Sequence, residues 1–208
     1  MDLEIAEPAA DTPLSRRSLV TRACAASLAG LAAALVIDRS APVSAAAPDE
    51  LPNLPTESDA ALLERMMRVE LAANALYRSA LENASDDLAV VTGVLAENHL
   101  AYAQAIAGIT GLSAQGADEE LIAEYEPSFT GQTEEYLASA HTLEQALVAT
   151  QTELVGVYES SDAITLTASI ATVEARQATV IAELLGVEDL DVLFGNDQSP
   201  LELTGDDA

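Results

Sequence analysis

Three glutamates of this sequence stand on helical patterns that are otherwise apolar. Glu70, Glu144 and Glu174 each fall near the middle of a segment whose apolar residues recur every three or four positions. A buried carboxylate without a partner is costly, so such a group is normally paired, protonated or bound to a cation. Carboxylates that three separate helices direct to one point therefore indicate a metal site.

Nitrogen, amide and phenol groups accompany these acids. Gln177 follows Glu174 by three residues, a spacing that puts both side chains on one helix face, and His99 and Tyr102 have the same spacing on another segment. Histidine offers an imidazole nitrogen and glutamine a neutral amide oxygen, whereas tyrosine offers a phenolate only if a metal lowers its pKa. The candidate metal ligands are Glu70, His99, Glu144, Glu174 and Gln177, with Tyr102 as a further candidate.

Two other residues are candidates by position alone. Glu97 lies two residues before His99, about 200° around a helix, so the two side chains cannot both point inward. We expect His99 to point inward. His141 lies one turn before Glu144 and would serve as a ligand, as a hydrogen-bond partner of a ligand, or as a cap. In the alternative without a metal, His99 is an ordinary core residue and the glutamates lie half-exposed or pair with Arg65, Arg68 or Arg176.

The elements that must position these residues are four long helices, predicted at residues 59–83, 87–110, 133–159 and 162–186. Ser58 is the expected N-cap of the first helix, and Gly111 is expected to end the second. Only a few residues separate the helices of the first pair and of the second pair, which predicts two antiparallel hairpins. The loop of about 20 residues between the pairs can return along a helix of about 36 Å. One such crossover is typical of a ferritin-like four-helix bundle.

The four segments also resemble a known family. VELAANALY, AENHLAYAQAIAG, TLEQALVATQ and ASIATVEARQATVIAELLG are similar to the helices of the exported ferritin-like domain family, which carries its metal on E, E-x-x-H, E and E-x-x-H. The resemblance covers about residues 59–186 and is most specific in the last segment, where family members commonly read VEARH. By position, the family's single glutamates correspond to Glu70 and Glu144, and the acid of its last motif to Glu174. Gln177 stands in place of a histidine, and His99 and Tyr102 stand in place of the Glu and His of the second helix.

This resemblance implies an all-α ferritin-like protein with an altered di-metal site. Three carboxylates and one imidazole would hold one ion of iron or another divalent metal, and a site that has lost its metal is the other possibility. We expect a structural, stress-related or envelope role rather than classical ferroxidase turnover. Two alternatives stay open: an active di-iron protein that oxidises Fe²⁺ or removes peroxide, and a helical envelope module that binds a partner without metal. Either could form a homo-oligomer.

The N-terminal residues have the layout of an export signal. Arg16 and Arg17 in SRRSLV resemble the twin-arginine signal, with Leu19 where that signal often has Phe. The apolar run at 23–37 has 15 residues, fewer than the roughly 20 that span a membrane, although an uncleaved anchor is the alternative. We therefore predict export across the cytoplasmic membrane to the cell envelope or the exterior, with no membrane span in the mature form.

The predicted order along the chain has four parts. Residues 1–47 form the signal, 48–58 a proline-rich linker, 59–186 the bundle and 187–208 an acidic tail. The tail is expected to be loose apart from LDVLF, a docking patch. The only cysteine, Cys24, lies in the signal, which excludes disulfide and thiolate chemistry from the mature chain.

The charge excludes one further class of partner. The chain has 35 acidic residues and eight arginines but no lysine, for a net charge of −27. A nucleic-acid interface needs clustered basic residues on one face, so we expect no nucleic-acid partner. Glycines occur singly and do not form a phosphate-binding loop.

Overall fold

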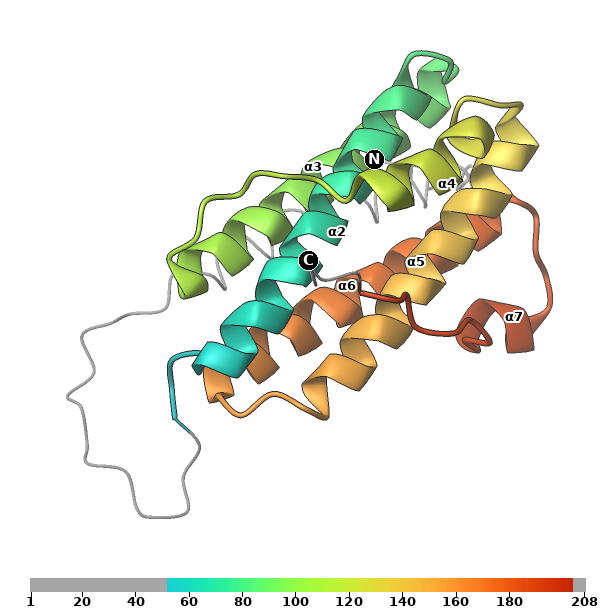
Figure 1. The fold of residues 1–208 in the computed structure, drawn as a ribbon. Coiled ribbons are helices and arrows are strands. Elements are labelled where there is room, and N and C mark those ends of the chain that lie inside the picture. The colour runs from blue at the N-terminus through green and yellow to red at the C-terminus, as the bar shows by residue number, and fades with distance from the viewer. Residues whose placement is uncertain (1–51, 204–208) are drawn as a thin grey trace, which may run out of the picture. The chain divides into compact units, whose positions relative to one another are not determined.

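The computed structural model describes residues 52–203, with the side chain of Asp86 left out. The signal at 1–47 with Cys24, the first part of the linker and the last five residues of the tail lie outside the described residues. Helices α2 to α7 occupy the described part (Figure 1). Their bounds are Glu57–Leu81 for α2, Asp86–Thr110 for α3, Glu119–Phe129 for α4, Thr133–Val155 for α5, Ser161–Leu184 for α6 and Leu190–Phe194 for α7.

Two helix pairs form the bundle. α2 packs along α3 and α5 packs along α6, each pair joined by a short connection, while α4 lies against α2 and α5 (Figure 1). The buried side chains include Leu63, Met66, Tyr77, Ile106 and Ile181 from the predicted apolar stripes, and also Leu147, which the predicted stripe of its helix did not include. The prediction of an all-α bundle with one long crossover between the two helix pairs is confirmed. Between residues 52 and 203, no helix combines the length and apolarity that crossing a membrane requires.

The ends of the helices follow local capping. Thr56, not the expected Ser58, is the N-cap of α2: its hydroxyl accepts a hydrogen bond from the Asp59 N–H at 3.2 Å, and Asp59 Oδ2 accepts one from the Thr56 N–H at 3.1 Å. This reciprocal pair is a capping box with Asp in the place of the usual Glu. Gly111 ends α3 as predicted, at a positive φ of 76° that glycine adopts without strain.

The crossover is more ordered than the sequence suggested. It contains an 11-residue helix, α4, where a loop was predicted. Asp118 caps this helix by accepting hydrogen bonds from the N–H groups of Glu120 and Leu121, and its own N–H donates to the Arg68 carbonyl of α2 at 3.1 Å. Pro127 lies in the last turn, where it has no N–H to donate to the carbonyl four residues earlier. Phe129 is 1% exposed, so the crossover contributes to the core.

Asp59 also joins α2 to the connection between α5 and α6. Its Oδ1 accepts a hydrogen bond from the Glu159 N–H at 2.8 Å, and its side chain is buried. Burial alone would raise the pKa of Asp59, but hydrogen bonds from Glu159, Thr56 and Ser160 outweigh it and hold the pKa below its usual value. The ionised carboxylate is thus the form that closes this end of the bundle.

Replacing Asp59 by alanine should lower the free energy of unfolding by about 2–3 kcal/mol, because it leaves the Glu159 and Thr56 N–H groups without their acceptor. Urea denaturation of the full chain measures this, with exposed Glu64→Ala on the same helix as the matched control. Since the pKa of Asp59 is lowered in the folded state, its contribution is present above the ordinary carboxyl pKa and disappears as the pH falls. Equal stability of the two variants at pH 7 would contradict this role.

The described part of the tail is attached to the bundle rather than loose. α7, the predicted LDVLF patch, packs on α6, where the Thr179 hydroxyl donates to the Leu193 carbonyl at 3.3 Å. Beyond it, Asn196 Nδ2 donates to the Gln145 carbonyl at 2.8 Å, and the Leu201 N–H donates to the Thr150 hydroxyl at 2.8 Å. Polar groups at these points let the chain return along α5 (Figure 1).

Candidate metal centre

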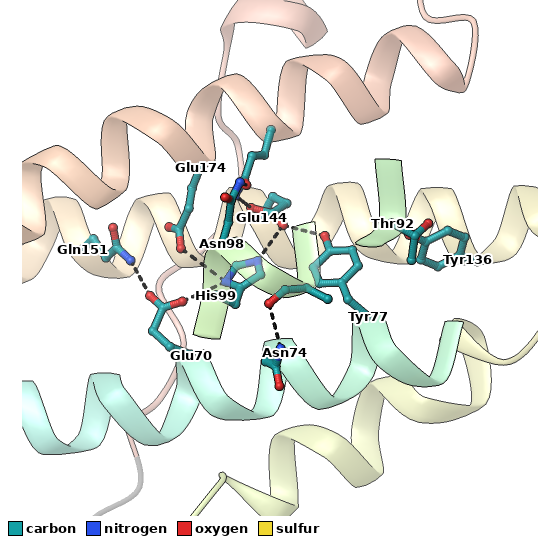
Figure 2. A network of polar contacts seen from close by, with 12 residues as sticks. Glu70, Asn74, Tyr77, Thr92, Asn98, His99, Tyr136, Glu144, Gln151 and Glu174 are labelled. Atoms are coloured by element: carbon teal, nitrogen blue, oxygen red, sulfur yellow. Dashed lines mark hydrogen bonds and ion pairs between the residues drawn. The ribbon is translucent and has the colours of Figure 1, made fainter. Parts of the chain in front are cut away.

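Four of the predicted side chains meet inside the bundle. Glu70 comes from α2, His99 from α3, Glu144 from α5 and Glu174 from α6, and each is 0% exposed. We call this group the centre. Each residue lies at the middle of its helix and on its apolar stripe, so packing of the four stripes directs all four side chains inward (Figure 2). The alternative with half-exposed, arginine-paired glutamates is wrong.

The His99 ring lies among the three carboxylates. Its Nδ1 is 2.8 Å from Glu70 Oε2 and 3.8 Å from Glu174 Oε1, and its Nε2 is 3.1 Å from Glu144 Oε1 (Figure 2). Both ring nitrogens therefore face carboxylate oxygens. An ionised carboxylate only accepts hydrogen bonds, so with Glu70 and Glu144 both ionised and no metal bound, His99 is an imidazolium that donates from both nitrogens.

Two of the carboxylates are well supplied with hydrogen-bond donors. Glu144 Oε1 accepts from the Tyr77 hydroxyl at 2.5 Å as well as from His99, and Glu144 Oε2 accepts from Gln177 Nε2 at 3.2 Å. Glu70 Oε1 accepts from Gln151 Nε2 at 2.9 Å, while its Oε2 faces His99. These bonds fix the orientation of both carboxylates.

Glu174 differs, because neither of its carboxylate oxygens has a hydrogen-bond partner although both are buried. A polar group in this state costs about 1–3 kcal/mol, and a charged one costs more. The residue lies next to two potential ligands: donor atoms of Glu70, His99 and Glu174 all lie within 4.8 Å of one another. A cation bound between them would remove the cost of burying Glu174.

Burial and mutual repulsion set the protonation of the centre. Burial, followed by the charges of Glu70 and Glu144, raises the pKa of Glu174 well above its usual value. Burial alone would lower the pKa of His99, but the carboxylates of Glu144 and Glu70 outweigh it and raise the pKa to about 10. The metal-free centre therefore holds protons where a metal-bound centre would hold the ion.

Comparison with known proteins identifies the fold family. The sequence model of a ferritin-like domain matches residues 58–187, more than half of the chain. The chain belongs to the ferritin-like domain family. Neither the curated proteins nor the solved structures give a significant match.

Within this ferritin-like bundle, Gln177 does not present a free oxygen to the centre. Its Oε1 accepts a hydrogen bond from Asn98 Nδ2 at 2.7 Å, and its Nε2 faces Glu144. Gln177 therefore directs an amide that donates to a carboxylate. Ligation by Gln177 would have to use the oxygen that already accepts the bond from Asn98.

The remaining candidates have distinct positions. Tyr102 is buried with its ring edge against His99, 5.7 Å between centroids, and its hydroxyl has no hydrogen-bond partner. Burial and the charges of the nearby carboxylates raise the pKa of Tyr102, which favours the neutral phenol. Glu97 is exposed while His99 points inward, as predicted. His141 is half-buried and lies outside the cluster of donor atoms, and burial lowers its pKa.

Three residues of the centre's surroundings were not assigned a role from the sequence. Tyr77 stacks on the His99 ring, with 5.3 Å between centroids and 9° between planes, and donates to Glu144. Gln151 holds Glu70, and Asn98 holds Gln177. Tyr77 and Gln151 lie on the same predicted stripes as Glu70 and Glu144, about two turns away in each case. Their polar atoms on an otherwise apolar helix face were the signal in the sequence that could have identified them as partners of the centre.

Proposed function

We propose that this ferritin-like protein binds one divalent metal ion, iron or another, through Glu70, His99 Nδ1 and Glu174. The observation that carries the proposal is the fully buried Glu174 carboxylate, which has no hydrogen-bond partner and lies beside two other donor atoms. Two carboxylates and one imidazole suit borderline and hard divalent cations. Zinc, manganese and ferrous iron are the ions to compare.

The chain's own residues would prepare this site. Gln151 holds Glu70 through Oε1 and leaves Oε2 directed at His99, while the ring of Tyr77 stacks on His99 and limits its rotation. When bound, the ion would supply positive charge that neutralises the buried carboxylates and, if it is iron, a one-electron redox couple. Complete burial keeps the side chains of the centre out of contact with bulk solvent.

The proposed role is structural or stress-related rather than two-iron ferroxidase turnover. Di-iron bundles of this architecture use Glu-x-x-His on two helices, and this chain has His99 with Tyr102 on one and Glu174 with Gln177 on the other. Fewer ligands therefore remain for a second ion. The leader with Arg16 and Arg17 supports export to the envelope or exterior. If an Arg16→Lys, Arg17→Lys double variant stays in the cytoplasm while the wild type leaves it, export through this leader is supported.

The test of metal binding uses the full chain. We expect chelator-treated protein to take up one Zn²⁺, Mn²⁺ or Fe²⁺ per chain by elemental analysis, and to oxidise Fe²⁺ in air no faster than buffer does. Uptake of two irons with rapid oxidation would instead support an active di-iron protein. No uptake, together with a higher melting temperature when Glu70, Glu144 and Glu174 are all replaced by leucine, would support a metal-free interaction module.

A further inference from the structure

The three glutamates of the centre have different environments. Glu144 accepts hydrogen bonds from three donors, the Tyr77 hydroxyl, His99 Nε2 and Gln177 Nε2, at 2.5, 3.1 and 3.2 Å. Glu174 accepts none. Both carboxylates are equally buried, so the difference lies in what surrounds them rather than in exposure. Glu144 Oε1 already accepts two hydrogen bonds and Oε2 accepts one, so most of the lone pairs of Glu144 are occupied, whereas no donor occupies those of Glu174.

We propose that Glu144 is a positioning residue that orients His99 and is not itself a metal ligand. This proposal rests on the proposed metal site. It gives a role to Glu144, the fourth buried residue of the centre, and limits each chain to one ion. Glu144 Oε1 lies 3.1 Å from His99 Nε2 and so stabilises the proton that stays on this nitrogen when an ion replaces the proton on Nδ1. The other nitrogen, Nδ1, is then the one that presents its lone pair to the ion beside Glu70 and Glu174.

The residues around Glu144 hold it in this role. Tyr77 stacks on the His99 ring while its hydroxyl donates to the same carboxylate oxygen that His99 contacts, so ring and carboxylate are held as a unit. Gln177 presents its Nε2 to Glu144 because its Oε1 is held by Asn98. A second ion that used Glu144 as a ligand would have to compete with these donors. The contacts that orient His99 thereby also disfavour a second metal.

Zinc is the probe for this inference, because it has no redox chemistry and binds imidazole well. We expect the full-length wild-type chain to bind one Zn²⁺ in calorimetric titration. Glu144→Gln should still bind one Zn²⁺, with affinity about 10–100-fold lower, the usual effect of removing the carboxylate partner of a histidine ligand. Tyr77→Phe should weaken binding less, and exposed Glu153→Gln on the same helix should not change it.

Nitrogen NMR of the zinc-loaded wild type gives a readout that a merely structural role would not move, and it needs no variant to fold. We expect His99 of the zinc-loaded wild type to carry its proton on Nε2 and the metal on Nδ1. Metal on Nε2, or two Zn²⁺ per wild-type chain with one lost in Glu144→Gln, would overturn the inference while leaving metal binding intact. Absence of zinc binding by the wild type would overturn the proposed function and this inference with it.

Discussion

Glu174→Leu should stabilise the metal-free protein and at the same time remove its metal binding. The carboxyl group of Glu174 is buried without a hydrogen-bond partner, so a leucine of similar size relieves a desolvation cost of about 1–3 kcal/mol. For a bundle of this size, each kcal/mol raises Tm by about 2–4 °C. Because Glu174 is a proposed ligand, its loss should weaken zinc binding by more than about 100-fold. That is the largest effect expected when only the hydrogen-bond partner of a ligand is lost.

Thermal unfolding with and without zinc separates the two effects. The wild type should gain Tm on adding zinc, whereas Glu174→Leu should start higher and gain nothing. Glu183→Leu, an exposed position on the same helix, is the matched control and should retain the zinc response. If Glu174→Leu melts below the metal-free wild type, then Glu174 has a stabilising partner in solution and the basis of the proposed site is wrong.

Metal affinity should rise steeply with pH. Binding through Nδ1 displaces one proton from His99, whose pKa is raised to about 10, and a second from Glu174 wherever that group is still protonated. Each displaced proton changes the affinity about tenfold per pH unit. Between pH 6 and 8 we therefore expect at least about a 100-fold gain, which levels off only as the pH passes the pKa of His99.

The metal-free protein should respond to pH in the opposite sense. A histidine whose pKa is raised on folding stabilises the fold below its ordinary pKa, and this contribution is lost as pH rises through about 10. The stabilisation that zinc provides should consequently widen between pH 6 and 9. Calorimetric titrations in buffers of different ionisation enthalpy count the protons released. Zinc affinity that is flat from pH 6 to 8 would show that His99 is not a ligand.

Much of the fold could be predicted because helical periodicity and capping are local. The stripes of Leu63, Met66 and Ile106 indicated long amphipathic helices, and the unequal connection lengths indicated one crossover. α4 was missed because it is short and acidic and contains Pro127, all of which disfavour a helix in isolation. It forms because Leu121 and Phe129 are buried by contacts distant in sequence, which periodicity does not report.

The site was only partly predictable for a related reason. Spacing shows which face of a helix a residue occupies, and that was enough to bring Glu70, His99, Glu144 and Glu174 together. Spacing does not show which donors each carboxylate meets, so the contrast between Glu144 and Glu174 could not be seen in the sequence. The same limit applies to Gln177, whose orientation depends on Asn98 of another helix.

The sealed interior also has a kinetic consequence. Because the side chains of the centre are 0% exposed, an ion can enter or leave only when the bundle transiently opens. Residence time is then governed by the frequency of this breathing motion and much less by the ambient ion concentration. Once loaded, such a protein would keep its ion through dilution or brief exposure to a chelator, as a slow reservoir does and a rapid exchanger does not.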